Sequence, residues 1–381
     1  MNGSLTRVGA IVTKEFKHLG RDRRMLAAVV LLPILQLLLF AYALSFDVEN
    51  VPTVVIDLDK TPTSQQYVQR YEESAFFQVV GHPERMSDVD TAFAEGTARV
   101  AVIIPAGFEQ TILSGQHAEI AVLIDGSEPT SARVGRSYSV AINQVFSGEL
   151  TREWAADQGL DLSAVGTLEP RLRTWYNPDH RSSDFLIPGL MVVILAIVTV
   201  QQTAVTLVRE RSLGTEEQLE VSPLRKLELM IGKLIPWTLL AFVDVVLITA
   251  IGVFGLGVPL RGSVLALALG ATLFILSCLG MGLAVSAVAP SEDTANIAAM
   301  MIAMLPSFLL SGFVFPLEQM PTIVQWIAYA FPARYMVALS RGVFLKGAGL
   351  TELWPQLGAL ALTSFLLIAI STVLYSRRAR Q

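Results

Sequence analysis

Long apolar runs separated by polar stretches organise this chain. Each run has about the 20 or more residues that an α-helix needs to cross the hydrocarbon core of a bilayer. The runs cover residues 25–46, 184–208, 229–256, 263–289, 294–315 and 356–376. The pattern predicts an all-α membrane bundle of six transmembrane helices.

Residues 47–183, between the first two apolar runs, have a different pattern. Short runs rich in Val and Ile alternate with stretches of helical periodicity, which is typical of an α/β domain. Strands are expected at 51–59, 76–80, 99–105 and 119–125, and helices at 62–73, 86–95, 107–113 and 129–156. The sequence therefore predicts an α/β (α+β) domain inserted between the first two spans.

Two further segments fit neither pattern. Residues 1–24 place apolar side chains near helical spacing among six Lys and Arg residues, which predicts a cytoplasmic interfacial helix. Residues 316–347 are apolar but are interrupted by Pro316, Pro321 and Pro332, so two short re-entrant helices in the outer leaflet are expected. These helices either cap the bundle or handle substrate directly, and the sequence leaves both interpretations open.

Composition and charge set the membrane context. Of the 381 residues, 52% are hydrophobic and 16% are charged, and the mean hydropathy is +0.53, which indicates a membrane protein. Residues 47–183 hold 20 acidic against 10 basic side chains, so the rest of the chain carries +5. Lys and Arg gather in 1–24, 209–233 and 377–380, which places both termini in the cytoplasm and the inserted domain outside. Cys278 is the single cysteine, so no intrachain disulfide can form.

The polar segment 209–228, between the second and third spans, is the most specific stretch. It reads Arg-Glu-Arg, then Gly-Thr, then Glu-Glu-Gln-Leu and Ser-Pro-Leu. Thr215 can cap a short helix whose first turn carries acidic side chains, and Pro223 ends that helix. The simplest interpretation is a solvated loop between two spans, but the order of these residues is more particular than such a loop requires.

This order resembles the loop of the ABC-2 type transporter permeases, R-E-R-x-x-G-T-x-E-x-L-x-x-[ST]-P. The similarity continues in PLRGS at 259–263, LPSFLLSGFVFPLEQMP at 305–321 and FPARYMVALSRGVFLKG at 331–347. The resemblance implies an ABC-2 (type V ABC exporter-like) fold in which 209–228 is a coupling helix that docks on a separate ATP-binding subunit. The residues that it places at or behind this contact are Glu210, Arg211, Gly214, Thr215, Glu217, Leu219 and Pro223.

The resemblance also implies a complex. A second permease copy, identical or paralogous, would complete the membrane pathway. ATP and Mg²⁺ are expected on the ATP-binding partner, because this chain lacks the G-x-x-x-x-G-K-[ST] phosphate loop. No cofactor, metal site, catalytic residue or nucleic-acid partner is expected of the chain itself.

The large outer domain is similar to a branch of the family often described as multidrug exporters. The expectation is therefore export of a drug, lipid or peptide across a bacterial inner membrane. Membrane lipid surrounds such a protein, and in a double-membrane bacterium a periplasmic adaptor is a further expected partner of the outer domain.

Polar side chains inside the apolar runs are the remaining functional candidates, because burying them in lipid is costly. They are Gln201, Gln202, Asp244 and Asn296. Each lines a pathway or forms a hydrogen bond between helices, and for Asp244 the structural interpretation is favoured. The competing functional class is a non-transporting membrane scaffold or receptor whose outer domain binds a partner. A plain anchor needs only one or two spans, which disfavours that class.

Overall fold

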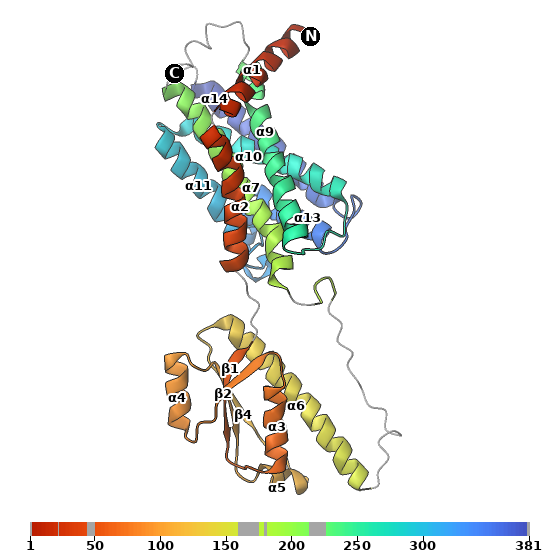
Figure 1. Ribbon diagram of the computed structural model, residues 1–381. Coiled ribbons are helices and arrows are strands. Elements are labelled where there is room, and N and C mark those ends of the chain that lie inside the picture. Colours follow the sequence, from red (N-terminus) through yellow and green to blue (C-terminus); the bar gives the residue numbers. More distant parts are fainter. Residues whose placement is uncertain are drawn as a thin grey trace. The chain divides into compact units, whose positions relative to one another are not determined.

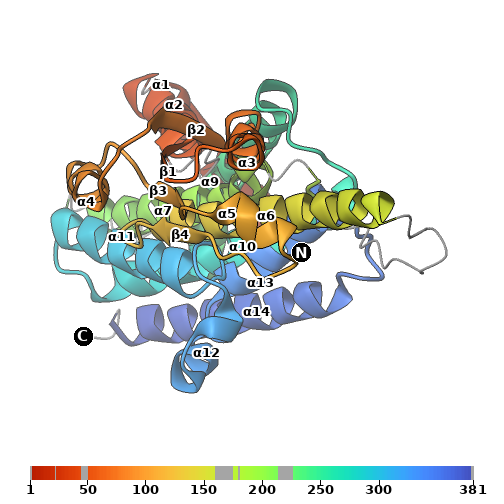
Figure 2. The ribbon, with the colours of Figure 1, turned by 90° about the horizontal axis from the view of Figure 1, so that it is seen from below.

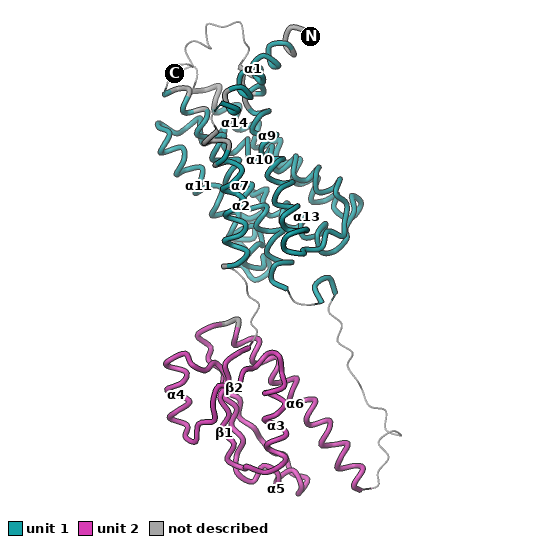
Figure 3. Tube along the Cα trace, viewed as in Figure 1, with its two compact units in different colours: residues 1–45, 174–381 teal, residues 46–173 magenta. Residues whose placement is uncertain are grey.

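The chain forms two compact units, residues 1–45 with 174–381 and residues 46–173 (Figure 3). This computed structural model describes residues 2–21, 23–43, 50–158, 175–178, 181–212 and 226–378. Each unit has its own hydrophobic core, so each is considered by itself.

The first unit is helical (Figure 1). Two short helical turns, the π-turn η2 (Ile251–Gly255) and the 3₁₀ turn η3 (Leu317–Gln319), interrupt the longer elements. The α-helices are α1 (Asn2–Arg21), α2 (Arg23–Ala43), α7 (Ser182–Ser212), α9 (Lys226–Ala250), α10 (Val264–Val288), α11 (Glu292–Leu309), α12 (Thr322–Ala328), α13 (Pro332–Phe344) and α14 (Trp354–Arg378).

Four helices in the described ranges are long and apolar enough to cross a membrane, and they cover Ser182–Thr206, Leu234–Gly255, Val264–Val288 and Trp354–Leu374. The apolar stretch of α2, Val29–Tyr42, is shorter. Helix α11 ends at Leu309, before the limit of 315 expected from the apolar run, because Gly312 takes a positive φ of 80° and the chain bends there. The unit is thus a bundle with several apolar helices, and the count of six spans stays a prediction.

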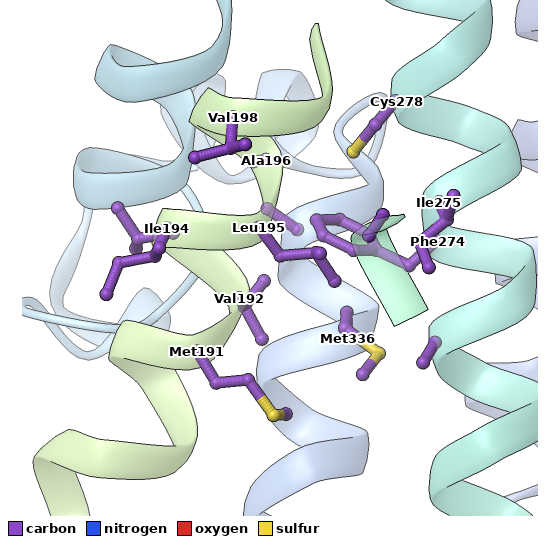
Figure 4. Packing of buried hydrophobic residues seen from close by; sticks show 14 of the residues in the cluster. Met191, Val192, Ile194, Leu195, Ala196, Val198, Phe274, Ile275, Cys278 and Met336 are labelled. Carbon is purple, nitrogen blue, oxygen red and sulfur yellow. The ribbon is translucent and has the colours of Figure 1, made fainter. Parts of the chain in front are cut away.

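Helix α7 lies at the centre of the bundle. In its apolar window 83% of the residues are buried, against 28% in α9 and 22% in α14. A helix that is apolar all round is expected in such a central position. Met191 and Leu195 of α7 pack with Phe274 of α10 and Met336 of α13 (Figure 4). The free Cys278 is buried in the same cluster.

Small residues let α10 approach its neighbours closely. Helices α10 and α14 run side by side (Figure 2), and Gly280 faces the backbone of Leu367 there. On the α7 side, a Cβ added at Gly282 would come 2.6 Å from Cβ of Thr203. Glycine at such positions is typical of packing between membrane helices.

The second unit is an α/β domain with a four-stranded sheet in the order β2-β1-β3-β4. Strand β1 is parallel to both β2 and β3, and β3 is antiparallel to β4. The strands are β1 (Val51–Asp57), β2 (Phe77–Gly81), β3 (Val100–Ile104) and β4 (Ala121–Ile124). The helices are α3 (Pro62–Glu72), α4 (Met86–Glu95), α5 (Phe108–Leu113) and α6 (Pro129–Asp157).

The sheet is buried on both faces. Helices α3, α5 and α6 cover one face with a core that includes Tyr67, Phe108 and Phe146, and α4 covers the other with Val89. The domain is therefore an α/β/α sandwich, whose elements occur where the alternating pattern predicts them.

Asp59, just after β1, ties the sheet to α5. Its carboxylate accepts hydrogen bonds from the backbone nitrogens of Gly107, Phe108 and Glu109 at 2.7, 3.0 and 3.0 Å, and one from the hydroxyl of Thr61 at 2.6 Å. The Thr61 hydroxyl first, and then the amides, lower the pKa of Asp59.

Candidate functional site

The predicted coupling segment connects α7, which ends at Ser212, to α9, which begins at Lys226. Residues 213–225 lie outside the described residues, so Gly214, Thr215, Glu217, Leu219 and Pro223 keep their predicted roles as predictions. Glu210 and Arg211 belong to the last turn of α7, and the orientation of their side chains is also outside the description. The helices on both sides of the segment are well defined.

An ion pair fixes the end of α7 to the start of α11. Nε of Arg209 lies 3.2 Å from Oε2 of Glu292. Glu292 belongs to the first turn of α11, where the helix dipole favours a carboxylate. The helix that enters the coupling segment is thus held to α11 at this end of the bundle.

A second ion pair fixes the start of α9 to α1. Nε of Arg7 lies 3.4 Å from Oε2 of Glu228, which is buried. One turn further on, Ile11 of α1 packs against Gly232 so closely that a Cβ on Gly232 would come 2.7 Å from the Ile11 side chain. Buried Ile11, Glu15 and Leu19 form one face of α1. The amphipathic helix predicted at the N-terminus therefore lies against the helix that leaves the coupling segment.

Two of the four intramembrane polar candidates form a pair. The side-chain amide of Gln201 on α7 donates to Oδ1 of Asn296 on α11 at 2.7 Å. Counting along α11, Asn296 lies one turn inward from Glu292. The hydrogen bond and the Arg209–Glu292 ion pair therefore form a polar seam between α7 and α11, defined by these four residues.

Gln202 and Asp244 are not part of this seam. Gln202 is half-buried on α7. Asp244 lies in α9, is 2% exposed, and neither of its carboxylate oxygens has a hydrogen-bond partner among the described residues. An unpartnered carboxylate in an apolar helix is costly, so Asp244 remains a candidate for function.

The other motif stretches meet each other in the fold, which was not expected from their spacing in the sequence. The backbone nitrogen of Gly262, in PLRGS, donates to the carbonyl of Val343 on α13 at 2.8 Å. A Cβ at Gly262 would come 2.6 Å from the carbonyl oxygen of Ala348, so this position requires glycine. The guanidinium of Arg341 donates to the carbonyls of Gly312 and Phe313 at 2.8 and 2.9 Å. The glycines of these motifs are the one signal in the sequence that could have indicated close backbone contact.

In the described ranges, no group of three or more His, Cys, Asp or Glu side chains could hold a metal ion. The polar features described in the helical unit are contacts between helices.

A bundle of several long apolar helices around a buried central helix defines a multi-span membrane protein. The sequence model for ABC-2 family transporter proteins matches residues 23–373, and the chain belongs to this family.

Curated relatives agree with this assignment. The chain is 31% identical to the probable multidrug ABC transporter permease YbhS of Escherichia coli K12 over 345 residues, 90% of each chain. It is 28% identical to the probable multidrug ABC transporter permease YbhR of the same organism, over 92% of this chain and 93% of YbhR. It is 23% identical to ABC transporter G family member 20 of Dictyostelium discoideum, over 91% of this chain and 47% of that protein. The chain is the permease subunit of an ABC exporter, as the resemblance in its motifs predicted.

Proposed function

We propose that this permease moves an amphipathic substrate, such as a drug, lipid or peptide, outward across a bacterial inner membrane. A separate ATP-binding subunit, which carries ATP and Mg²⁺, supplies the energy. A second permease copy, identical or paralogous, completes the pathway. The names of YbhS and YbhR as probable multidrug permeases support this substrate class.

The proposed topology has six spans. Helix α2 contributes the first and α11 the fifth, in addition to the four helices that satisfy length and composition. At 1.5 Å per residue, the 18 residues of α11 extend about 27 Å, close to the roughly 30 Å of a bilayer core. An even number of spans, with basic residues at both ends, places both termini in the cytoplasm and residues 46–173 outside.

The proposed mechanism rests on two ion pairs, one on each side of residues 213–225 along the chain. Arg209–Glu292 ties the entering helix α7 to α11, and Arg7–Glu228 ties the leaving helix α9 to α1. A force on the segment between them therefore acts on four helices at once. When the ATP-binding subunits close, the docked segment moves, and the helices change between two arrangements.

The predicted contact residues can be tested with a charge reversal. We expect Glu217→Arg to weaken co-purification of the tagged permease with the ATP-binding subunit encoded beside it, and to lower the ATP hydrolysis of the complex. Glu220→Arg makes the same charge change in the same segment at a position outside the family motif, and it should leave both measurements near wild type. Failure of the wild-type chain to recover any ATP-binding subunit would favour the scaffold class instead.

The outer domain, with its excess of acidic side chains, is proposed to meet a periplasmic adaptor. Deletion of residues 50–175 is the test. The proposal requires loss of export in cells while the shortened chain still co-purifies with the ATP-binding subunit. Full export by the shortened chain would rule this role out.

A further inference from the structure

A cavity of about 740 Å³ lies at the end of the bundle where α7 and α14 begin. Its wall is formed by the first turns of these two helices, by α13, and by the segment from Ser311 to Glu318. This volume lies in the range of small-molecule sites. Two of the motif stretches, 305–321 and 331–347, contribute to the wall.

The cavity wall carries three cations against two carboxylates, Glu318 and Glu352. Arg334, Arg341 and Lys346 line it, and in the described part of the chain none of the three forms an ion pair. Of the two acidic residues in the wall, Glu352 is already engaged, because it accepts hydrogen bonds from the nitrogen of Gly349 at 2.7 Å and the hydroxyl of Thr351 at 3.0 Å. The site therefore favours an anion.

Two of the cations are held rigidly. The guanidinium of Arg341 bonds two carbonyls and lies 3.7 Å from the ring centroid of Phe185. That of Arg334 donates to the carbonyl of Gln325 at 3.2 Å and lies 3.7 Å from the ring of Tyr329. Carbonyls and rings orient a guanidinium without cancelling its charge. Lys346, in contrast, is exposed and free to reach a ligand.

Part of the remaining wall is apolar, and the surroundings mark a membrane interface. Phe185, Val337 and Leu353 line the same cavity. Trp326 on α12 and Trp354 at the start of α14 are 72% and 70% exposed. Exposed Trp side chains at helix ends are typical of the level where lipid headgroups lie. An occupant therefore has an anionic group and an apolar part at this level.

We propose that this cavity binds the phosphate headgroup of an anionic phospholipid, with its acyl chains extending into the bilayer. The cations hold the phosphate, and the apolar wall contacts the glycerol and the first part of the chains. The inference rests on the placement of this end of the bundle at the outer leaflet, which is part of the proposed function. It does not depend on export or on the ATP-binding subunit.

The test uses the full-length chain, purified and stripped of lipid. Native mass spectrometry and a thermal-shift titration compare dioleoyl phosphatidylglycerol, dioleoyl phosphatidylethanolamine and dioleoylglycerol, which share their acyl chains. Glycerol 1-phosphate and inorganic phosphate supply the anionic group without those chains. The proposal predicts preferential binding of phosphatidylglycerol and weak binding of both chain-free phosphates.

Variants then locate the site. Lys346→Gln should lower the affinity for phosphatidylglycerol about fivefold, as expected for one cation beside an anionic lipid, and Lys346→Arg should restore it. Arg261→Gln is the matched control, because Arg261 lies near this end of the bundle but not in the cavity wall. Since Lys346 is exposed, its replacement does not threaten folding, whereas replacement of Arg341 removes two hydrogen bonds.

Three results would overturn the proposal. The first is equal binding of phosphatidylglycerol and phosphatidylethanolamine by the wild-type chain. The second is an equal loss in Arg261→Gln and Lys346→Gln, which would indicate diffuse surface charge. The third is binding of glycerol 1-phosphate as tight as that of the lipid, which would assign the cavity to a soluble phosphate compound. Because the ATP-binding subunit is absent from this experiment, its outcome is independent of the coupling test.

Discussion

Gly282 of α10 lies directly against the backbone of α7, so that a Cβ added at Gly282 would come 2.8 Å from the carbonyl oxygen of Val200. A backbone oxygen cannot rotate away as a side chain can. The central helix and α10 therefore approach each other closely here, and the position has no room for a larger residue.

Gly282→Val should destabilise the protein by roughly 1–3 kcal/mol through overpacking. The measurement is the thermal unfolding of the purified chain in detergent. Gly358→Val on α14 is the control, because a Cβ there meets no atom within 4 Å. Equal unfolding temperatures for the two variants would contradict the close contact.

The ion pair between Arg7 and Glu228 should support coupling. Glu228→Lys places a cation beside Arg7, and we expect lower ATP-driven transport with the ATP-binding subunit still bound. Adding Arg7→Glu should restore part of the activity, because opposite charges face each other again. Exchange of the charges of Arg70 and Glu149, which pair at 2.8 Å in the α/β domain, is the control and should have no such effect.

The hydrogen bond between Gln201 and Asn296 should contribute about 0.6 kcal/mol to stability, the average measured for polar contacts between membrane helices, and at most about 1.7 kcal/mol. A double-mutant cycle with Gln201→Leu and Asn296→Leu measures it. We expect the double variant to be more stable than the sum of the two single losses predicts, because neither amide is then left unpaired. Strict additivity would show that the two side chains do not interact.

Replacement of Asp244 by an apolar residue should raise the stability of the chain and lower its transport activity. Asp244→Leu removes a buried carboxylate that has no partner among the described residues, so the chain should gain about 1–3 kcal/mol in stability. We expect transport to fall in the same variant, since costly polar groups in spans are usually retained for function. Asp244→Asn, which keeps the shape and polarity, is the companion variant. Full transport by Asp244→Leu would assign the residue to packing alone.

The pairing of strands β3 and β4 in the α/β domain should become less stable in acid. Hydrogen bonds from Ser127, and then the guanidinium of Arg99, lower the pKa of Asp125 to about 2. A carboxylate whose pKa is lowered on folding stabilises the fold above its unfolded pKa of about 3.9, and this contribution is lost as the pH falls from there towards 2. The protection of the backbone amides of residues 121–124 against hydrogen exchange, corrected for intrinsic exchange rates, should decline as the pH falls through that window. Asp125→Asn should remove this part of the decline, and Asp90→Asn on α4 should not.

The sequence predicted local structure well wherever one rule decided it. The helix expected at 62–73 is α3, which the capping box of Thr61 and Ser64 begins, and the apolar runs predicted the long helices of the bundle. The end of α11 was missed, because the positive φ of Gly312 interrupts a run that stays apolar to residue 315. Composition alone does not reveal such a bend.

The candidate site was predictable in part. The motifs identified the family, but they did not reveal that Gly262 and Arg341 bring three of these stretches together, since both act through backbone carbonyls of residues far away in the chain. Gln201 and Asn296 were identified as polar candidates, and their pairing depends on how α7 packs against α11. Tertiary contacts of this kind have no signal in residue spacing.

The 31 residues of α7 form one uninterrupted rod of about 46 Å. In the chain it comes after the α/β domain and before residues 213–225. A movement at one end of this helix is therefore passed along its length to the other end. Pro188, near the start of this helix, removes one backbone hydrogen bond. The helix can therefore bend at this position, so that its first turns tilt relative to the rest.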